Sequence, residues 1–144
     1  MKKVLFLIIA AVMTITSCEL ERSTGGSLDG FWQFYAADTL QGGGRADMRQ
    51  SAIFWAVQAK LLEMSDLNNA HPAIFFRFEH TGSSLILTHP VVNAKAEGDS
   101  LLTDPSLLLP YGLTRLVETL HVVELTDERM TLESQLLRMH FRKY

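Results

Sequence analysis

The chain has 144 residues, of which 47% are hydrophobic and 20% are charged, and this composition excludes an intrinsically disordered protein. Its one cysteine excludes an internal disulfide framework and a cysteine-based zinc cluster. The formal net charge is −3, and it becomes −5 without Lys2 and Lys3, because 13 − 2 = 11 basic side chains then stand against 16 acidic ones. Such a charge repels phosphate backbones, so we expect no nucleic acid partner.

The first 17 residues predict an export signal. Lys2 and Lys3 give it a positive start, and residues 4–13 form an apolar run too short to span a bilayer as a helix. The segment Ile15-Thr16-Ser17-Cys18 then resembles the lipobox of bacterial lipoproteins. The resemblance implies cleavage between Ser17 and Cys18 and attachment of a diacylglycerol to the Cys18 thiol. An ordinary cleaved signal with a chance cysteine is the alternative.

Acyl chains on Cys18 would anchor the protein, since each buried CH₂ group contributes about 0.8 kcal/mol to membrane binding. Residues 18–27 are mostly polar and predict a flexible tether between lipid and domain. We therefore expect an exported protein that its lipid holds at a membrane of the bacterial cell envelope. The expected location is the outer membrane, and the sequence does not indicate in which of its leaflets the lipid lies. Residues 28–144 are expected to form one folded domain.

From Leu28 onward, apolar side chains recur with a period of two, which is typical of half-buried β-strands. Residues 73–80 place Ile74, Phe76 and Phe78 on one side of a strand, and residues 85–88 predict the return strand after a polar turn.

The C-terminal segment predicts a hairpin whose register follows from the side chains. If residues 134–137 close the turn, apolar residues face apolar residues and one pair of opposite charges is aligned. The predicted pairs are Leu132 with Met139, Met130 with Phe141, and Glu133 with Arg138.

Two segments have ambiguous patterns. Residues 116–125 fit a helical stripe as well as a strand, and their β-branched residues favour the strand. Residues 51–64 alternate like a strand but contain good helix formers, and we interpret them as one strand. A total of about eight strands predicts an all-β antiparallel barrel, with an immunoglobulin-like sandwich as the alternative.

Both ends of this domain resemble lipocalins. The segment Leu28-Asp29-Gly30-Phe31-Trp32 resembles the Gly-x-Trp signature of the first lipocalin strand, and residues 137–144 resemble the last barrel strand. The resemblance implies a lipocalin-like barrel in which a basic residue packs on Trp32 at the closed end. Lys143 is the candidate for that role and Arg142 is the alternative. Behind a lipobox, the pattern is similar to small lipocalin-like lipoproteins of Gram-negative bacteria, many of which have no assigned function.

Apolar side chains that face the barrel interior form a candidate pocket for a small apolar or amphipathic molecule, and a packed core is the alternative. The candidate ligand-binding residues are Trp55, Phe76, Phe78, Leu85, Leu87, Tyr111 and Met139. Residues 101–113 are rich in leucine and contain two prolines, which predicts an irregular segment. It either packs onto the barrel, covers its mouth as a lid or exposes an apolar patch.

The sequence contains no catalytic or phosphate-binding motif that we recognise, and its five histidines lack metal-ligand spacing. We expect no cofactor, no metal and no enzymatic activity. His140 between Arg138 and Arg142 predicts a solvated basic row, with a patch for an anionic partner as the alternative. The function that we expect is an envelope-anchored binder of a small apolar or amphipathic ligand. The alternative is a filled barrel that docks another envelope protein through the leucine segment and the basic row.

Overall fold

The computed structural model describes residues 26–94 and 98–144, and in this part of the chain strands dominate. Three 3-10 helices accompany them: η1 (Gly26–Leu28), η2 (Arg49–Ser51) and η3 (Pro105–Tyr111). The strands are β1 (Gly30–Thr39), β2 (Arg45–Asp47), β3 (Ile53–Gln58), β4 (Leu61–Asp66), β5 (Ile74–His80), β6 (Ser84–Ala94), β7 (Gly98–Leu101), β8 (Glu118–Leu125), β9 (Arg129–Glu133) and β10 (Leu137–Lys143).

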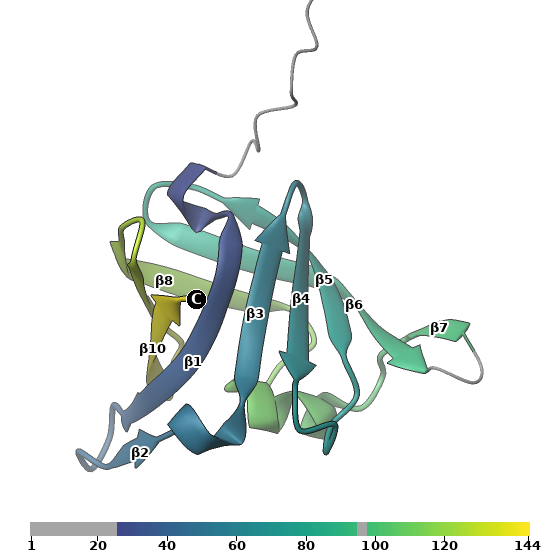
Figure 1. Cartoon of the computed structure of the whole chain (residues 1–144), viewed down its shortest axis with the longest axis horizontal. Coiled ribbons are helices and arrows are strands. Elements are labelled where there is room, and N and C mark those ends of the chain that lie inside the picture. Colours follow the sequence, from purple (N-terminus) through teal and green to yellow (C-terminus); the bar gives the residue numbers. More distant parts are fainter. Residues whose placement is uncertain (1–25, 95–97) are drawn as a thin grey trace, which may run out of the picture.

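Eight of these strands form a closed antiparallel barrel (Figure 1). The barrel strands are neighbours in chain order, β1-β3-β4-β5-β6-β8-β9-β10, and β10 closes the sheet by pairing with β1. The short strands β2 and β7 lie outside this barrel order and pair with β1 and β6, respectively. The predicted all-β barrel is therefore confirmed, and its closure excludes the sandwich.

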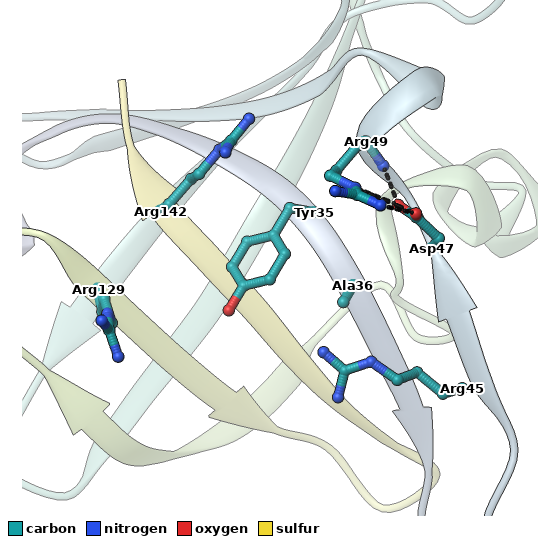
Figure 2. Close-up of a pocket in the computed structure, with 7 residues that line it drawn as sticks. All are labelled: Tyr35, Ala36, Arg45, Asp47, Arg49, Arg129 and Arg142. Carbon is teal, nitrogen blue, oxygen red and sulfur yellow. Dashed lines mark hydrogen bonds and ion pairs between the residues drawn. The ribbon is translucent and has the colours of Figure 1, made fainter.

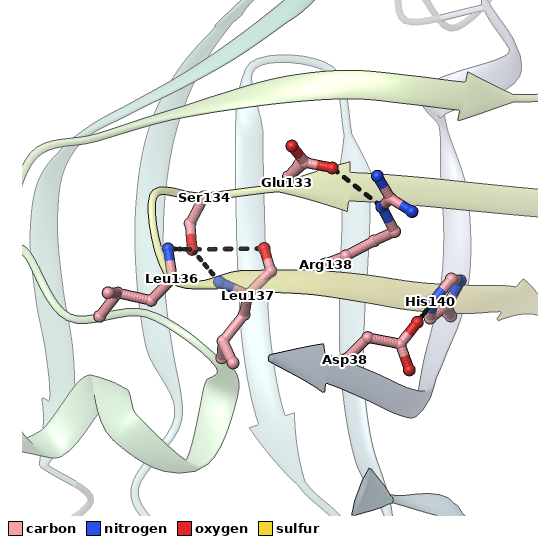
Figure 3. A network of polar contacts seen from close by, with 7 residues as sticks. All are labelled: Asp38, Glu133, Ser134, Leu136, Leu137, Arg138 and His140. Carbon is pink, nitrogen blue, oxygen red and sulfur yellow. Dashed lines mark hydrogen bonds and ion pairs between the residues drawn. The ribbon is translucent and has the colours of Figure 1, made fainter. Parts of the chain in front are cut away.

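The predicted register of the last hairpin is confirmed at every pair. Leu132 lies opposite Met139, and Glu133 lies opposite Arg138, with the Arg138 Nε atom 2.8 Å from the Glu133 carboxylate. The Ser134 hydroxyl oxygen accepts hydrogen bonds from backbone N–H groups of the turn, at 3.0 Å from Leu137 (Figure 3). Apolar pairing and a side-chain-stabilised turn thus select one register.

Two other predicted strands are confirmed with shifted bounds. The segment around residues 116–125 contains strand β8, as its β-branched residues had indicated. The hairpin after residue 80 is also present, and its return strand β6 continues to Ala94, well beyond the predicted residues 85–88.

The prediction of one strand over residues 51–64 is wrong, because the chain turns back within this segment. β3 and β4 form a hairpin in which Gln58 pairs with Leu61. The two loop residues are Ala59 and Lys60, and Ala59 has a φ of +55°. An alanine in this left-handed region gives no turn signal in the sequence, which explains the error. After the turn, Leu62 and Met64 face the interior.

One end of the barrel is closed by Trp32 and Lys143. Trp32 is fully buried, and its indole Nε1 donates a hydrogen bond to the Leu28 carbonyl oxygen at 2.8 Å. The Lys143 Nζ lies 4.6 Å from the Trp32 ring centroid and donates to the Asp29 carbonyl oxygen at 3.0 Å. The contact that the lipocalin resemblance implies for Lys143 is thus present, with a cation–π component.

Gly30 makes room for this lysine. Its φ is +139°, and a Cβ atom placed on it would lie 2.9 Å from the Lys143 Cε. A larger residue would therefore push the lysine stem away from Trp32. Arg142, the alternative to Lys143, bonds instead to Gln33, at 2.7 Å between Nε and Oε1.

Replacing Trp32 by alanine tests this closure. The variant should lose about 3–5 kcal/mol of unfolding free energy, because it removes a fully buried indole and leaves a cavity. Urea melts of wild type and Trp32→Ala give the difference. A loss below about 1 kcal/mol would contradict a structural role for this indole at the barrel end.

Candidate functional site

The barrel interior brings together nearly all the residues predicted to bind a ligand. Six of them are fully buried in the core, five from strands β3, β5, β6 and β10 and one from η3: Trp55, Phe76, Leu85, Leu87, Met139 and Tyr111. Phe78 is partly exposed and packs against the edge of this core, beside an outer groove that Arg77 also lines. The interior is therefore one continuous apolar cluster.

Side chains of the protein itself fill this interior. The Phe141 ring lies 5.1 Å from the Phe34 ring and 4.8 Å from the Trp55 ring, measured between centroids. Near these rings, a Cβ atom on Gly112 would lie 2.6 Å from the Met139 sulfur. There is no room for even a methyl group at this position. Close packing of this kind is typical of small eight-stranded barrels whose own side chains fill them.

The segment that includes η3 plugs the second end of the barrel. In Figure 1, η3 lies across the end opposite η1. Leu108, Tyr111 and Leu113 are fully buried there. The Tyr111 hydroxyl donates a hydrogen bond to the Pro72 carbonyl oxygen at 2.6 Å, and burial raises its pKa to about 12, helped by the nearby Asp66 carboxylate. The leucine segment thus packs down onto the barrel.

Part of the same segment is exposed. Leu109 is 60% exposed, although its neighbour Leu108 is fully buried. Other exposed leucines occur in the β1–β2, β4–β5 and β9–β10 connections at this end of the barrel (Figure 1). We call this set the leucine rim: Leu40, Leu67, Leu107, Leu109 and Leu136. Several apolar side chains around one end of a domain are typical of a contact surface.

Trp55 and Glu118 place polar groups in the apolar interior. The Trp55 Nε1 is buried and has no hydrogen-bond partner among residues 26–94 and 98–144. Glu118 faces inward opposite Leu87 on the neighbouring strand. Burial raises the pKa of the Glu118 carboxyl above its ordinary value, although the Arg115 charge lowers it in part. Sequence reasoning missed Glu118, because it occupies the first inward position of β8 and a charged residue there gives no apolar signal.

Within the described ranges, no three histidine, cysteine, aspartate or glutamate side chains lie close enough together to hold a metal ion. No helix in this same part of the chain is both long and apolar enough to cross a membrane. Ser17, Cys18 and most of the predicted tether at residues 18–27 lie outside the described residues.

Comparisons with known proteins agree with this architecture. A model of a lipocalin-like domain family matches residues 12–144. The crystal structure of a lipocalin-like protein from Bacteroides uniformis superposes with a TM-score of 0.64 at 17% identity, covering 83% of this chain and 100% of that one. An uncharacterized protein from Bacteroides eggerthii gives a TM-score of 0.57 at 19% identity, covering 81% and 98%. These two likenesses establish the fold alone. No curated protein matches the chain.

Replacing Glu118 by glutamine should stabilise the protein at neutral pH. Folding raises the pKa of this carboxyl. Its contribution to the free energy of unfolding is therefore complete below about pH 4.5, and it is lost as the pH rises through the raised pKa. The melting temperature of Glu118→Gln should therefore exceed that of wild type at pH 7, and the difference should shrink below pH 4.5. Glu79→Gln, at an exposed position, is the control. Equal melting temperatures of wild type and Glu118→Gln at pH 7 would contradict this burial cost.

Proposed function

This chain belongs to the lipocalin-like domain family, and we propose that it is a lipoprotein of the bacterial cell envelope whose filled barrel docks a partner protein. The single observation that carries the proposal is the packing of the interior. Trp55, Phe76 and Met139, which a ligand would contact, are fully covered by other side chains of the domain. A barrel of this kind presents its outer surface for recognition.

The arrangement of the two barrel ends supports docking away from the membrane. The described chain begins at Gly26, beside the closed end where Lys143 packs on Trp32. The leucine rim lies at the opposite end of the barrel (Figure 1). A lipid on Cys18 would tether the protein through the first end and leave the rim directed toward a partner. The partner surface that fits it is apolar at its centre, as in stable protein interfaces.

Serine substitutions at the rim test the docking proposal. Leu107→Ser with Leu109→Ser should abolish a defined cross-linked complex in the native envelope, because both side chains are exposed and their loss removes apolar contact area. The matched control is Leu61→Ser with Val123→Ser, which changes two exposed apolar residues outside the rim. The measurement is chemical cross-linking in membranes of the native host, followed by immunoblotting. Equal loss of the complex in both double variants, or in neither, would refute the rim as the docking surface.

Replacing Cys18 by serine tests the anchor. The variant should incorporate no radioactive palmitate and should leave the membrane fraction, since a hydroxyl replaces the thiol that the lipobox resemblance implies as the acylation site. Palmitate labelling and fractionation of wild type and Cys18→Ser measure both effects. Labelling of the variant at the wild-type level would exclude the lipobox assignment.

A small apolar ligand inside the barrel is the second candidate function, and one observation favours it. The buried Trp55 Nε1 lacks an acceptor among the described residues, and a ligand oxygen would supply one. Entry would require the η3 segment, with Leu108 and Tyr111, to leave the barrel end as a lid. Titration with a fluorescent fatty acid separates the two functions, because saturable quenching of tryptophan fluorescence by the bound probe is expected only for a barrel that opens.

A further inference from the structure

A groove of about 700 Å³ on the outside of the barrel gathers four arginines around one tyrosine. Figure 2 shows Tyr35 between Arg129 and Arg142 on one side and Arg45 and Arg49 on the other. Strand β1 contributes Tyr35 and Ala36, β2 contributes Arg45 and Asp47, and η2, β9 and β10 contribute Arg49, Arg129 and Arg142. A β-bulge between Phe34 and Ala36 directs Tyr35 into this position.

Two of the four arginines are balanced by carboxylates. The Arg49 Nε lies 2.9 and 3.0 Å from the two Asp47 oxygens, and these hydrogen bonds lower the pKa of Asp47 to about 2. Arg45 lies 3.2 Å from the Asp38 carboxylate. The positive charges of Arg49 and Arg45 are therefore largely compensated by carboxylates.

The other two arginines have no carboxylate partner among the residues that the structure describes. Arg142 bonds to the neutral amide of Gln33, and the Arg129 side chain makes no hydrogen bond or ion pair in these ranges. They are directly opposite each other in the β9–β10 ladder. Like charges in this arrangement destabilise a sheet. At the other end of the same hairpin, by contrast, Arg138 faces Glu133.

Gln33 holds one side of the Arg142 guanidinium in place. This glutamine is only 7% exposed, and its Nε2 donates to the Arg49 carbonyl oxygen at 3.4 Å. Its Oε1 accepts from the Arg142 Nε at 2.7 Å. The Nε edge of Arg142 is thereby fixed, and the two terminal nitrogens remain available for a planar, two-point contact with an oxyanion.

We propose that this groove binds a phosphate monoester, with Arg129 and Arg142 holding the phosphate and Tyr35 contacting the attached organic group. A phosphate monoester carries about −1.5 to −2 charges at neutral pH, which matches two uncompensated guanidinium groups better than the single charge of one carboxylate. The groove volume of about 700 Å³ also exceeds what one phosphate fills and lies within the roughly 300–1,000 Å³ of small-molecule sites. This site is separate from the leucine rim and requires no lipid anchor.

Titration of the purified protein with glycerol 1-phosphate tests the proposal. Calorimetry at constant ionic strength should give saturable binding, and Arg129→Gln and Arg142→Gln should each weaken it about 10-fold, because each removes a charge-assisted contact. In sodium chloride alone, Arg129→Gln should melt at the wild-type temperature or above, since it removes the repulsion between the opposed arginines and breaks no side-chain hydrogen bond. A purely structural role of Arg129 would instead lower the melting temperature.

Arg77→Gln is the matched control, because Arg77 is an exposed strand arginine that lines a different groove. It should bind glycerol 1-phosphate like wild type. Absence of saturable binding to wild type would overturn the proposal, as would equal weakening by Arg77→Gln. Tighter binding of a hexaglutamate peptide than of glycerol 1-phosphate would also overturn it, in favour of an acidic protein segment.

The source of the phosphate group is a separate question that two further arms answer. Vesicles of phosphatidylcholine containing phosphatidic acid present the monoester on a lipid, and inorganic phosphate presents it without an organic group. Arginine-dependent binding to these vesicles, but not to pure phosphatidylcholine, identifies a lipid headgroup as a source. Weaker binding of inorganic phosphate than of glycerol 1-phosphate supports the contact of Tyr35 with the organic part, and equal affinity would contradict that contact.

Discussion

The antiparallel pairing of β1 with β10 is the interaction on which the remaining structure depends. It joins the first and last strands of the domain and leaves no open edge between them. The same pairing sets Lys143 opposite Trp32, so closure of the sheet and closure of the barrel end are one event. Gly30 permits it, because any side chain there would meet the lysine stem.

Once the sheet is closed, its interior has to be filled. A described domain of little more than a hundred residues has limited apolar area, and this barrel uses it for its own stability. Phe34, Phe141 and Trp55 pack together in the interior, and Leu108 with Tyr111 plugs the end opposite Trp32. Recognition is then expected on the outside, where the leucine rim and the arginine groove lie in different places. The proposed tethering end, docking end and anion groove are thus compatible with one another.

The sequence predicts those parts of the fold in which neighbouring residues determine the outcome. The β9–β10 register follows from local pairing of Met130 with Phe141 and of Glu133 with Arg138. The same register also sets Arg129 against Arg142, a signal of the groove that was available from the sequence. The β3–β4 turn could not be predicted, because Ala59 occupies a conformation that its side chain does not favour.

Other parts of the sites depend on contacts between distant segments. Tyr35 reaches the groove through a bulge in β1, and Arg45 reaches it through a strand of three residues that pairs with β1. Neither feature has a distinct sequence pattern. The leucine-rich segment could equally have been a lid, a patch or a packed plug, because its composition is the same in each case. Whether this segment is buried depends on its contacts with the barrel end, which its own sequence does not specify.

Crystals pressurised with xenon test most directly the claim that the barrel is filled. Xenon occupies dry apolar cavities, so wild type should show no xenon site beside Trp55, whereas Leu85→Ala, which removes a fully buried side chain, should gain one. A well-occupied xenon site in the wild-type interior would contradict the account, because it would reveal space for a ligand.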